Sequence, residues 1–203
     1  MSGRLFVVAA PSGAGKTSLV KALLDELDDI QVSVSYCTRA MRPGEQDGVD
    51  YHFIDQDTFD AMVKADEFLE YAQVFGRSYG TGRAKVLEQL NQGFDIILEI
   101  DWQGARQIRS LVDDVVSVFI LPPSRSTLEE RLRGRGQDSE EVIARRMQEA
   151  VSEMTHYDEF DYVLINNDFN QALQELKCVV VAARHGCKAM KAKHLDLISE
   201  LLA

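Results

Sequence analysis

One segment near the N-terminus combines glycines, a lysine and a threonine at the spacing of a phosphate-binding loop. It reads Ala10-Pro-Ser-Gly-Ala-Gly-Lys16-Thr17. Gly13 and Gly15 allow the backbone to curl its N–H groups around a phosphate at a helix N-terminus, although alanine replaces the first glycine of the pattern. Lys16 would place a positive charge on the β- and γ-phosphates of a nucleotide, and the Thr17 hydroxyl would ligate Mg²⁺. The segment therefore predicts nucleotide binding, without naming the phosphoryl acceptor.

The elements around this loop predict an α/β fold. The apolar run Arg4–Ala10 reads as a buried strand before the loop, and Thr17–Leu27 carries apolar residues at helical spacing after it. This strand–loop–helix context favours a phosphate loop over a glycine turn with an exposed lysine. Further strands are expected at Asp95–Ile100, Val115–Leu121 and Tyr162–Ile165, separated by helices such as Gln103–Leu111. Such alternation predicts a parallel sheet covered by helices.

Two segments depart from this pattern. Between Gln31 and Arg83 the residues alternate as in a half-exposed sheet, which we interpret as an inserted subdomain with one short helix capped by Asp57. From Ser126 to Met154 the chain is charged and helical, with a capping-box spacing at Ser126 and a second helix start at Asp138. Residues 170–203 read as further helix.

A second chemical signature is a pair of arginines three residues apart, Arg39 and Arg42, just before a Pro-Gly turn. Arginine forks grip phosphate bidentately, so the pair fits a monophosphate clamp, but it fits solvated loop charges equally well. Context comes from segments whose order and spacing resemble the guanylate kinase family, most closely its bacterial members, over nearly the whole chain. They are residues 35–45, 50–53, 68–71, 79–81, 99–104 and 131–136.

The resemblance implies a set of site residues. Arg39, Arg42, Tyr51 and Tyr79 would hold the GMP phosphate, and Ser35, Glu70, Thr81 and Asp101 would face the guanine base. ATP would be bound by Ser12, Gly13, Ala14, Gly15, Lys16, Thr17, Ser18, Arg131 and Arg135. Lys16, Arg39, Arg135 and Arg146 would be catalytic, the last two reaching the transferred phosphoryl group from a lid.

Glu70 is expected to set base specificity. A carboxylate accepts from guanine N1–H and the 2-amino group, whereas the edge of adenine presents a different donor and acceptor pattern. Three residues depart from the usual family pattern, namely Ser78, Cys37 and Asn167. The first two stand beside the acceptor site, where they would affect GMP affinity.

The resemblance also implies an architecture and a reaction. The fold would be that of a P-loop nucleoside monophosphate kinase, with a parallel core (1–32, 84–123 and 155–203), a mixed-β GMP-binding subdomain (33–83) and a helical lid (124–154). The enzyme would transfer the γ-phosphoryl group of Mg·ATP to GMP by direct in-line displacement, as part of purine nucleotide metabolism. Positively charged donors aimed at the moving phosphoryl group would supply most of the catalysis.

Composition limits the partners. The 203 residues carry a formal net charge of −11, which argues against broad binding of nucleic acid or anionic membranes. Three cysteines without a C-x-x-C pair and the lack of a signal or membrane segment predict a cytoplasmic protein with reduced thiols. ATP and GMP are the expected substrates, with dGMP as a further candidate, and the sequence leaves the oligomeric state undetermined.

Three alternatives remain at this level. Another nucleoside monophosphate kinase would keep the phosphate loop and lid but read a different base. A non-catalytic guanylate-kinase-like module that binds phosphopeptides would typically have lost the ATP-binding loop, so the presence of Lys16 and Thr17 favours the enzyme. A GTP-hydrolysing switch is disfavoured because an N-K-x-D signature is absent.

Overall fold

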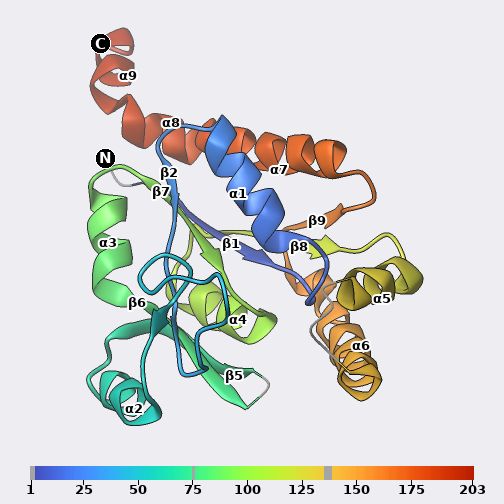
Figure 1. Cartoon of the computed structure of the whole chain (residues 1–203). Coiled ribbons are helices and arrows are strands. Elements are labelled where there is room, and N and C mark those ends of the chain that lie inside the picture. Colours follow the sequence, from blue (N-terminus) through green and yellow to red (C-terminus); the bar gives the residue numbers. More distant parts are fainter. Residues whose placement is uncertain (1–2, 75, 135–138) are drawn as a thin grey trace.

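The computed structural model describes residues 3–74, 76–134 and 139–203. Its core is a five-stranded parallel sheet in the order β2-β7-β1-β8-β9 (Figure 1). The strands are β1 (Leu5–Ala9), β2 (Ile30–Val32), β7 (Asp95–Glu99), β8 (Val116–Leu121) and β9 (Tyr162–Ile165). β1 lies in the middle, so the loop that follows it leaves the sheet at its centre.

Alternation along β1 divides the core into two layers. Phe6 and Val8 pack against one group of helices, whereas Leu5, Val7 and Ala9 face the other. The first layer is covered by α1 (Lys16–Glu26) and α7 (Phe169–Arg184), and the second by α3 (Arg83–Asn91) and α4 (Trp102–Leu111). All five residues of β1 are buried, as expected of a central parallel strand.

A second, mixed sheet has the order β4-β3-β6-β5. Its strands are β3 (Tyr36–Cys37), β4 (His52–Phe53), β5 (Phe68–Val74) and β6 (Arg77–Gly82). α2 (Gln56–Lys64) packs on this sheet through Phe59, whose ring stacks on Phe68 with 4.7 Å between centroids. β5 of the second sheet packs against α4, which covers the core sheet, and this contact joins the second sheet to the core.

Two expectations for this region need correction. Ile30–Val32 pairs with β7 in the core sheet, so the alternating run that begins at Gln31 serves both sheets in turn. The short helix begins at Gln56, because the Asp55 carboxylate accepts from Thr58 N–H and caps it two residues before the predicted Asp57.

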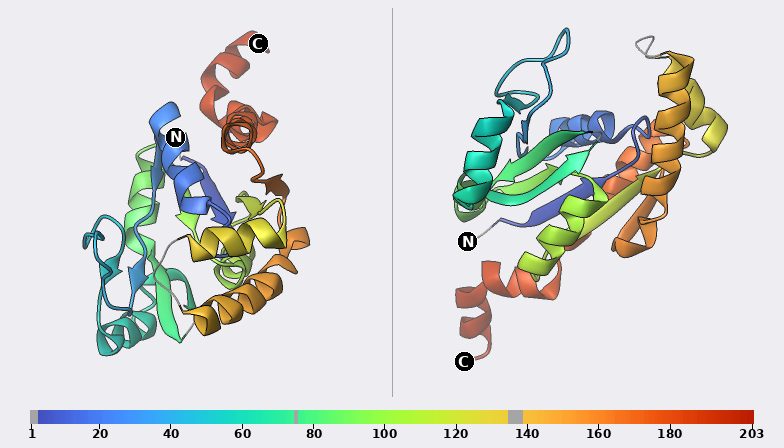
Figure 2. Two further views of the ribbon diagram at one scale, coloured as in Figure 1. Left: turned by 45° about the vertical axis from the view of Figure 1, so that its right-hand side comes forward. Right: turned by 90° about the horizontal axis from the view of Figure 1, so that it is seen from below.

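Two consecutive helices, α5 (Arg125–Arg133) and α6 (Glu140–Met154), pack together through Leu128, Leu132 and Ala150 (Figure 2). Their caps also differ from prediction. Ser124 caps α5 by accepting from Thr127 N–H, and Ser139 caps α6 by accepting from Val142 N–H. Each serine precedes its helix directly and so reaches an unpaired N–H group of the first turn.

The chain continues from α6 through a 3₁₀ turn (Tyr157–Glu159) and β9 into α7, α8 (Cys187–Lys193) and α9 (Leu195–Leu201). α9 projects away from the core (Figures 1 and 2). In the part of the chain that the structure describes, every helix is too short or too polar to cross a membrane.

Candidate active site

The phosphate loop leaves β1 and enters α1 through two glycines in left-handed backbone conformations. Gly13 has φ 95° and Gly15 has φ 97°, values that residues with a Cβ rarely adopt. A Cβ on Gly15 would also lie 2.4 Å from Asn166 Nδ2. Both the turn and the close packing therefore require glycine here. Lys16 follows as the first residue of α1, where the free N–H groups of a helix N-terminus can bind an anion.

The loop is fixed from outside by two side chains. Asn166, which is buried at the end of β9, donates from Nδ2 to the Ala14 carbonyl oxygen at 2.7 Å. Arg131 of α5 donates to the Asn166 carbonyl oxygen at 3.1 Å and to that of Ala14 at 3.5 Å. A cavity of about 400 Å³ lies beside this contact, lined by Gly13, Gly15, Ser18, Arg131, Asn166, Asn167 and Phe169.

Thr17 lies opposite a carboxylate that ends a neighbouring strand. Its Oγ1 donates to Glu99 Oε2 at 2.8 Å, and Glu99 is the last residue of β7. A hydroxyl that donates its proton to a carboxylate keeps lone pairs for a cation, and both groups are hard oxygen ligands. This donor set fits Mg²⁺. Glu99 was not predicted, although a carboxylate at the carboxyl end of a parallel strand beside the phosphate loop is a usable sequence signal.

Arg39 already holds a carboxylate in this structure. Its NH1 and NH2 groups donate to the two Glu45 oxygens, each at 2.6 Å. The guanidinium also lies over the rings of Tyr51 and Phe53, with its Cζ 4.9 Å and 5.3 Å from their centroids. The Arg39 guanidinium in turn holds the pKa of the Glu45 carboxyl below its usual range. Glu45 thus occupies a bidentate position that suits a phosphate equally well.

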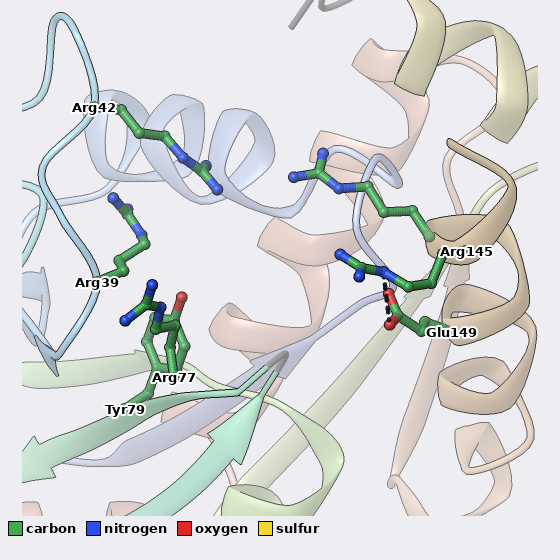
Figure 3. Close-up of a pocket in the computed structure, with 7 residues that line it drawn as sticks. Arg39, Arg42, Arg77, Tyr79, Arg145 and Glu149 are labelled. Carbon is green, nitrogen blue, oxygen red and sulfur yellow. Dashed lines mark ion pairs between the residues drawn. The ribbon is translucent and has the colours of Figure 1, made fainter. Parts of the chain in front are cut away.

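A cavity of about 240 Å³ separates the second sheet from α6 (Figure 3). Its walls carry five arginines and one glutamate beside a tyrosine. The lining residues are Arg39, Arg42, Arg77, Tyr79, Arg145, Arg146 and Glu149. Tyr79 packs edge-on against Tyr51, with 5.9 Å between ring centroids. Burial of Tyr51 raises the pKa of its hydroxyl to about 12, so that hydroxyl stays a proton donor at neutral pH.

Glu70 is a buried carboxyl group on β5. Its side chain accepts from Thr81 Oγ1 at 2.5 Å, and the two residues are 3% and 0% exposed. Burial raises the pKa of Glu70 to about 7, although the Thr81 hydrogen bond and the charge of Lys16 oppose that rise. Gly104 of α4 provides the space, because a Cβ there would lie 2.4 Å from Glu70 Oε2. Helix and strand therefore approach closely enough to enclose one carboxyl group.

The other residues expected at the base lie near this group. Thr81 pairs with Glu70 across β5 and β6, and Ser35 lies just before β3, where its carbonyl accepts from His52 N–H. Asp101 caps α4, accepting from Gly104 N–H and from Gln103 Nε2, each at 2.9 Å. The negative charge of Asp101 contributes to the raised pKa of Glu70, so the two carboxyl groups interact electrostatically.

A carboxylate from α6 also reaches the phosphate loop. Burial raises the pKa of Glu153 to about 7, while the charge of Lys16 and the nearby Ser12 N–H oppose that rise. Nothing in the sequence pattern indicated this residue, because it sits one position before Met154 on a helix with a single apolar stripe. Asn166 and Glu45 were likewise not predicted, though Glu45 lies within the arginine segment.

The structure therefore brings most of the predicted residues into one connected region. Ser12–Ser18 form the phosphate loop, Arg131 supports that loop, and Arg39, Arg42, Tyr79 and Arg146 line one cavity. Arg135, predicted to be catalytic, lies outside the described residues.

A parallel sheet with a phosphate loop after its central strand, a separate mixed sheet that encloses a buried acid, and an arginine-bearing helix pair define the class of P-loop nucleoside monophosphate kinases. Comparison with known proteins narrows this class. The family model for guanylate kinase matches residues 2–183. The chain belongs to the guanylate kinase family, and the predicted family, guanylate kinase function, enzyme class and fold are confirmed.

Individual relatives agree. The guanylate kinase of Chromohalobacter salexigens is 56% identical over 99% of this chain and 94% of its own length. That of Vibrio cholerae is 54% identical over 99% of this chain and 98% of its own length. The crystal structure of guanylate kinase from Anaplasma phagocytophilum superposes with a TM-score of 0.78 at 31% identity, covering 92% of this chain and 88% of that one.

Proposed function

We propose that this chain transfers the γ-phosphoryl group of ATP to GMP by direct in-line displacement, with the site residues in the roles given below. The observation that carries the proposal is the buried Glu70–Thr81 pair, which lies within the electrostatic reach of Lys16. The charge of Lys16 in the phosphate loop affects the pKa of Glu70, so the two residues are near each other. An acceptor base at Glu70 and a donor nucleotide on the loop would therefore lie side by side.

The acceptor is recognised at both ends. Glu70 accepts from guanine N1–H and the 2-amino group, and Thr81, Ser35 and Asp101 complete the polar surroundings of the base. A site whose buried polar groups would stay unpaired discriminates by up to about 10⁴ to 10⁵ against ligands that lack the partner groups. The GMP phosphate takes the place of Glu45 on Arg39 and also contacts Arg42, Tyr51 and Tyr79.

The donor is held by the phosphate loop. N–H groups of residues 12–18 surround the ATP phosphates, Lys16 contacts the β- and γ-phosphates, and Arg131 and Asn166 keep the loop in shape. Thr17 and Glu99 would hold Mg²⁺, which when bound neutralises charge on the phosphates. The cavity beside Ser18 and Phe169 offers room for the nucleoside part of ATP.

In the transfer step, an oxygen of the GMP phosphate attacks the γ-phosphorus, and the bond from that phosphorus to the β,γ-bridging oxygen breaks to release ADP. Arg39 and Lys16 fix the two reactants in line, and Arg146 of α6, with Arg135, stabilises the charge on the transferred group. Such positioning requires no covalent enzyme intermediate.

The proposal divides the chain into a core (1–32, 84–123 and 155–203), a GMP-binding subdomain (33–83) and a lid (124–154). Support comes from the second sheet, whose strands all fall between Tyr36 and Gly82, and from the separate small core of α5 and α6. Closure of the two outer parts would exclude water that otherwise hydrolyses ATP. The cytoplasm remains our proposed location, a choice that the free thiols of all three cysteines favour.

A coupled assay of ADP formation with each nucleoside monophosphate tests this function. We expect strong turnover with GMP and a loss of at least about 10²-fold in kcat/KM for Lys16→Ala and for Glu70→Ala, because each removes a charged contact to a substrate. Lys21→Ala removes an exposed positive charge from the same helix and should behave as the parent. Faster turnover of AMP, CMP or dTMP than of GMP would contradict the base assignment.

A further inference from the structure

The cavity between the second sheet and α6 carries more positive charge than the assigned residues account for. Its wall contains five arginines and one glutamate, in a chain whose formal net charge is −11. Arg77 is among these arginines and has no role in the proposed function. Figure 3 shows it beside Tyr79, on the side of the cavity opposite Arg145 and Glu149.

Strand geometry explains why Arg77 faces the cavity. Successive side chains of a strand point to opposite faces, so residues 77 and 79 share one face of β6. Ser78 points the other way, where its Oγ donates to Gln56 Oε1 at 3.2 Å and the residue is 9% exposed. The departure from the family pattern at Ser78 thus lies on the α2 side, whereas Arg77 lines the cavity with Tyr79.

Arg77 differs from Arg39 and Arg145 in its ion pairing. Arg39 pairs with Glu45 at 2.6 Å and Arg145 with Glu149 at 3.6 Å. Within residues 3–74, 76–134 and 139–203, the ion pairs leave Arg77 without a carboxylate partner. A long cationic side chain beside a phosphate-binding tyrosine and next to two other arginines can donate to an anion without first breaking an ion pair.

We propose that Arg77 is a third arginine of the acceptor-phosphate site, donating to a non-bridging oxygen of the GMP phosphate from the Tyr79 side. This inference rests on the proposed function, because it assumes that the GMP phosphate lies against Arg39, Arg42 and Tyr79. Arg77 binds and positions the acceptor, and the transferred phosphoryl group remains with Lys16 and the lid arginines.

Calorimetric titration with GMP and with guanosine tests the role of Arg77. We expect Arg77→Ala to weaken GMP binding by about tenfold, as for loss of one charge-assisted hydrogen bond, and to leave guanosine binding unchanged. Arg77→Lys should recover part of the loss, because it keeps the charge but loses the fork. Arg109→Ala, which removes an exposed arginine from α4, should bind GMP as the parent does.

Other outcomes would overturn the inference. Equal weakening for GMP and guanosine would assign Arg77 a purely structural role. Disappearance of the Arg77→Ala effect in a Glu149→Gln background would make Arg77 a contact to α6 instead. Unchanged GMP affinity in Arg77→Ala, together with a large loss in Arg39→Ala, would reject the inference but retain the proposed function. Unchanged affinity in Arg39→Ala would reject the acceptor site as a whole.

Discussion

At the scale of single residues, the site depends on how burial and hydrogen bonding alter a few side chains. Arg39 and Glu70 show two different solutions. Arg39 is neutralised by a bidentate carboxylate, so its fork is already shaped for a phosphate before GMP binds. Glu70 is buried with one hydroxyl donor and has a pKa raised to about 7. A ligand that donates hydrogen bonds to Glu70 would therefore shift it toward the ionised form near neutral pH.

This raised pKa predicts pH-dependent acceptor binding. Guanine donates two hydrogen bonds, so it prefers ionised Glu70, and the ionised fraction rises about tenfold between pH 6 and pH 8 for a pKa near 7. We expect the Kd for GMP to fall by about that factor over this range. Titrations in buffers of different ionisation enthalpy should also detect about half a proton released per GMP bound at pH 7.

Glu70→Gln provides the control for this experiment. The variant binds GMP with the same phosphate, whose own ionisation near pH 6 therefore affects both proteins alike. We expect a weaker Kd with a flatter pH profile. If parent and variant show the same pH dependence, Glu70 does not titrate on binding and its proposed role is wrong.

At the scale of elements, function depends on where one segment ends against another. Glu99 ends β7 beside Thr17, Gly104 lies in the first turn of α4 beside Glu70, and Asn166 directly follows β9 beside Ala14. Each contact joins residues far apart in the chain. The sequence pattern of the phosphate loop lies between β1 and α1, but its shape is stabilised in part by hydrogen bonds from Asn166, which follows β9, and from Arg131 of α5.

Asn166→Asp tests the support of the loop by β9. The carboxylate would meet the Ala14 carbonyl oxygen where the amide now donates at 2.7 Å, so the loop loses a buried hydrogen bond and gains a repulsion. We expect a loss of about 2 kcal/mol in the free energy of unfolding, seen as a Tm lower by about 5 °C, and a raised KM for ATP.

Asn167→Asp is the matched control, because it makes the same chemical change at the exposed neighbouring position. Its Tm should stay within about 1 °C of the parent, as for most surface substitutions. Equal Tm values for the two variants would show that Asn166 does not support the loop.

At the scale of the whole molecule, two carboxyl groups from different parts of the structure are buried and interact with the same lysine. Glu70 belongs to the second sheet and Glu153 to α6, yet burial raises the pKa of both to about 7 and the charge of Lys16 opposes both rises. Lys16 thus interacts electrostatically with a carboxyl group of the second sheet and with one of α6. Binding of nucleotides near Lys16 would change the electrostatic environment of Lys16, Glu70 and Glu153.

These raised pKa values predict that stability without substrates falls as pH rises. Below the unfolded pKa of 4.5 both states are protonated, and between 4.5 and about 7 only the unfolded state ionises, so the free energy of unfolding decreases across that window. Glu70 alone would contribute up to about 3 kcal/mol.

Denaturant unfolding between pH 4.5 and pH 8 measures this effect. We expect Glu70→Gln to gain stability relative to the parent as pH rises, by up to that amount, because the amide never ionises. Glu67→Gln, an exposed position on the same segment, should follow the parent at every pH. A constant difference between Glu70→Gln and the parent across the range would rule out a raised pKa in the folded state.

The sequence by itself determined the features that depend on local pattern. Gly13, Gly15 and Lys16 indicated the phosphate loop because a turn of this shape needs glycine and because a helix N-terminus binds an anion. Apolar runs such as 95–100 predicted the parallel core, and the spacing of several short segments indicated the family, which the comparisons confirm.

The tertiary structure decided which distant side chains meet, because such contacts follow from packing and leave no periodic trace in the chain. Glu99 on Thr17, Asn166 on Ala14 and Gly104 against Glu70 are of this kind. The division of residues 30–37 between two sheets is another, because an alternating run suits either sheet until its partner strand is present. The cavity at Arg77 belongs here too, since only the tertiary structure places Arg77 and Tyr79 of β6 opposite Arg145 of α6.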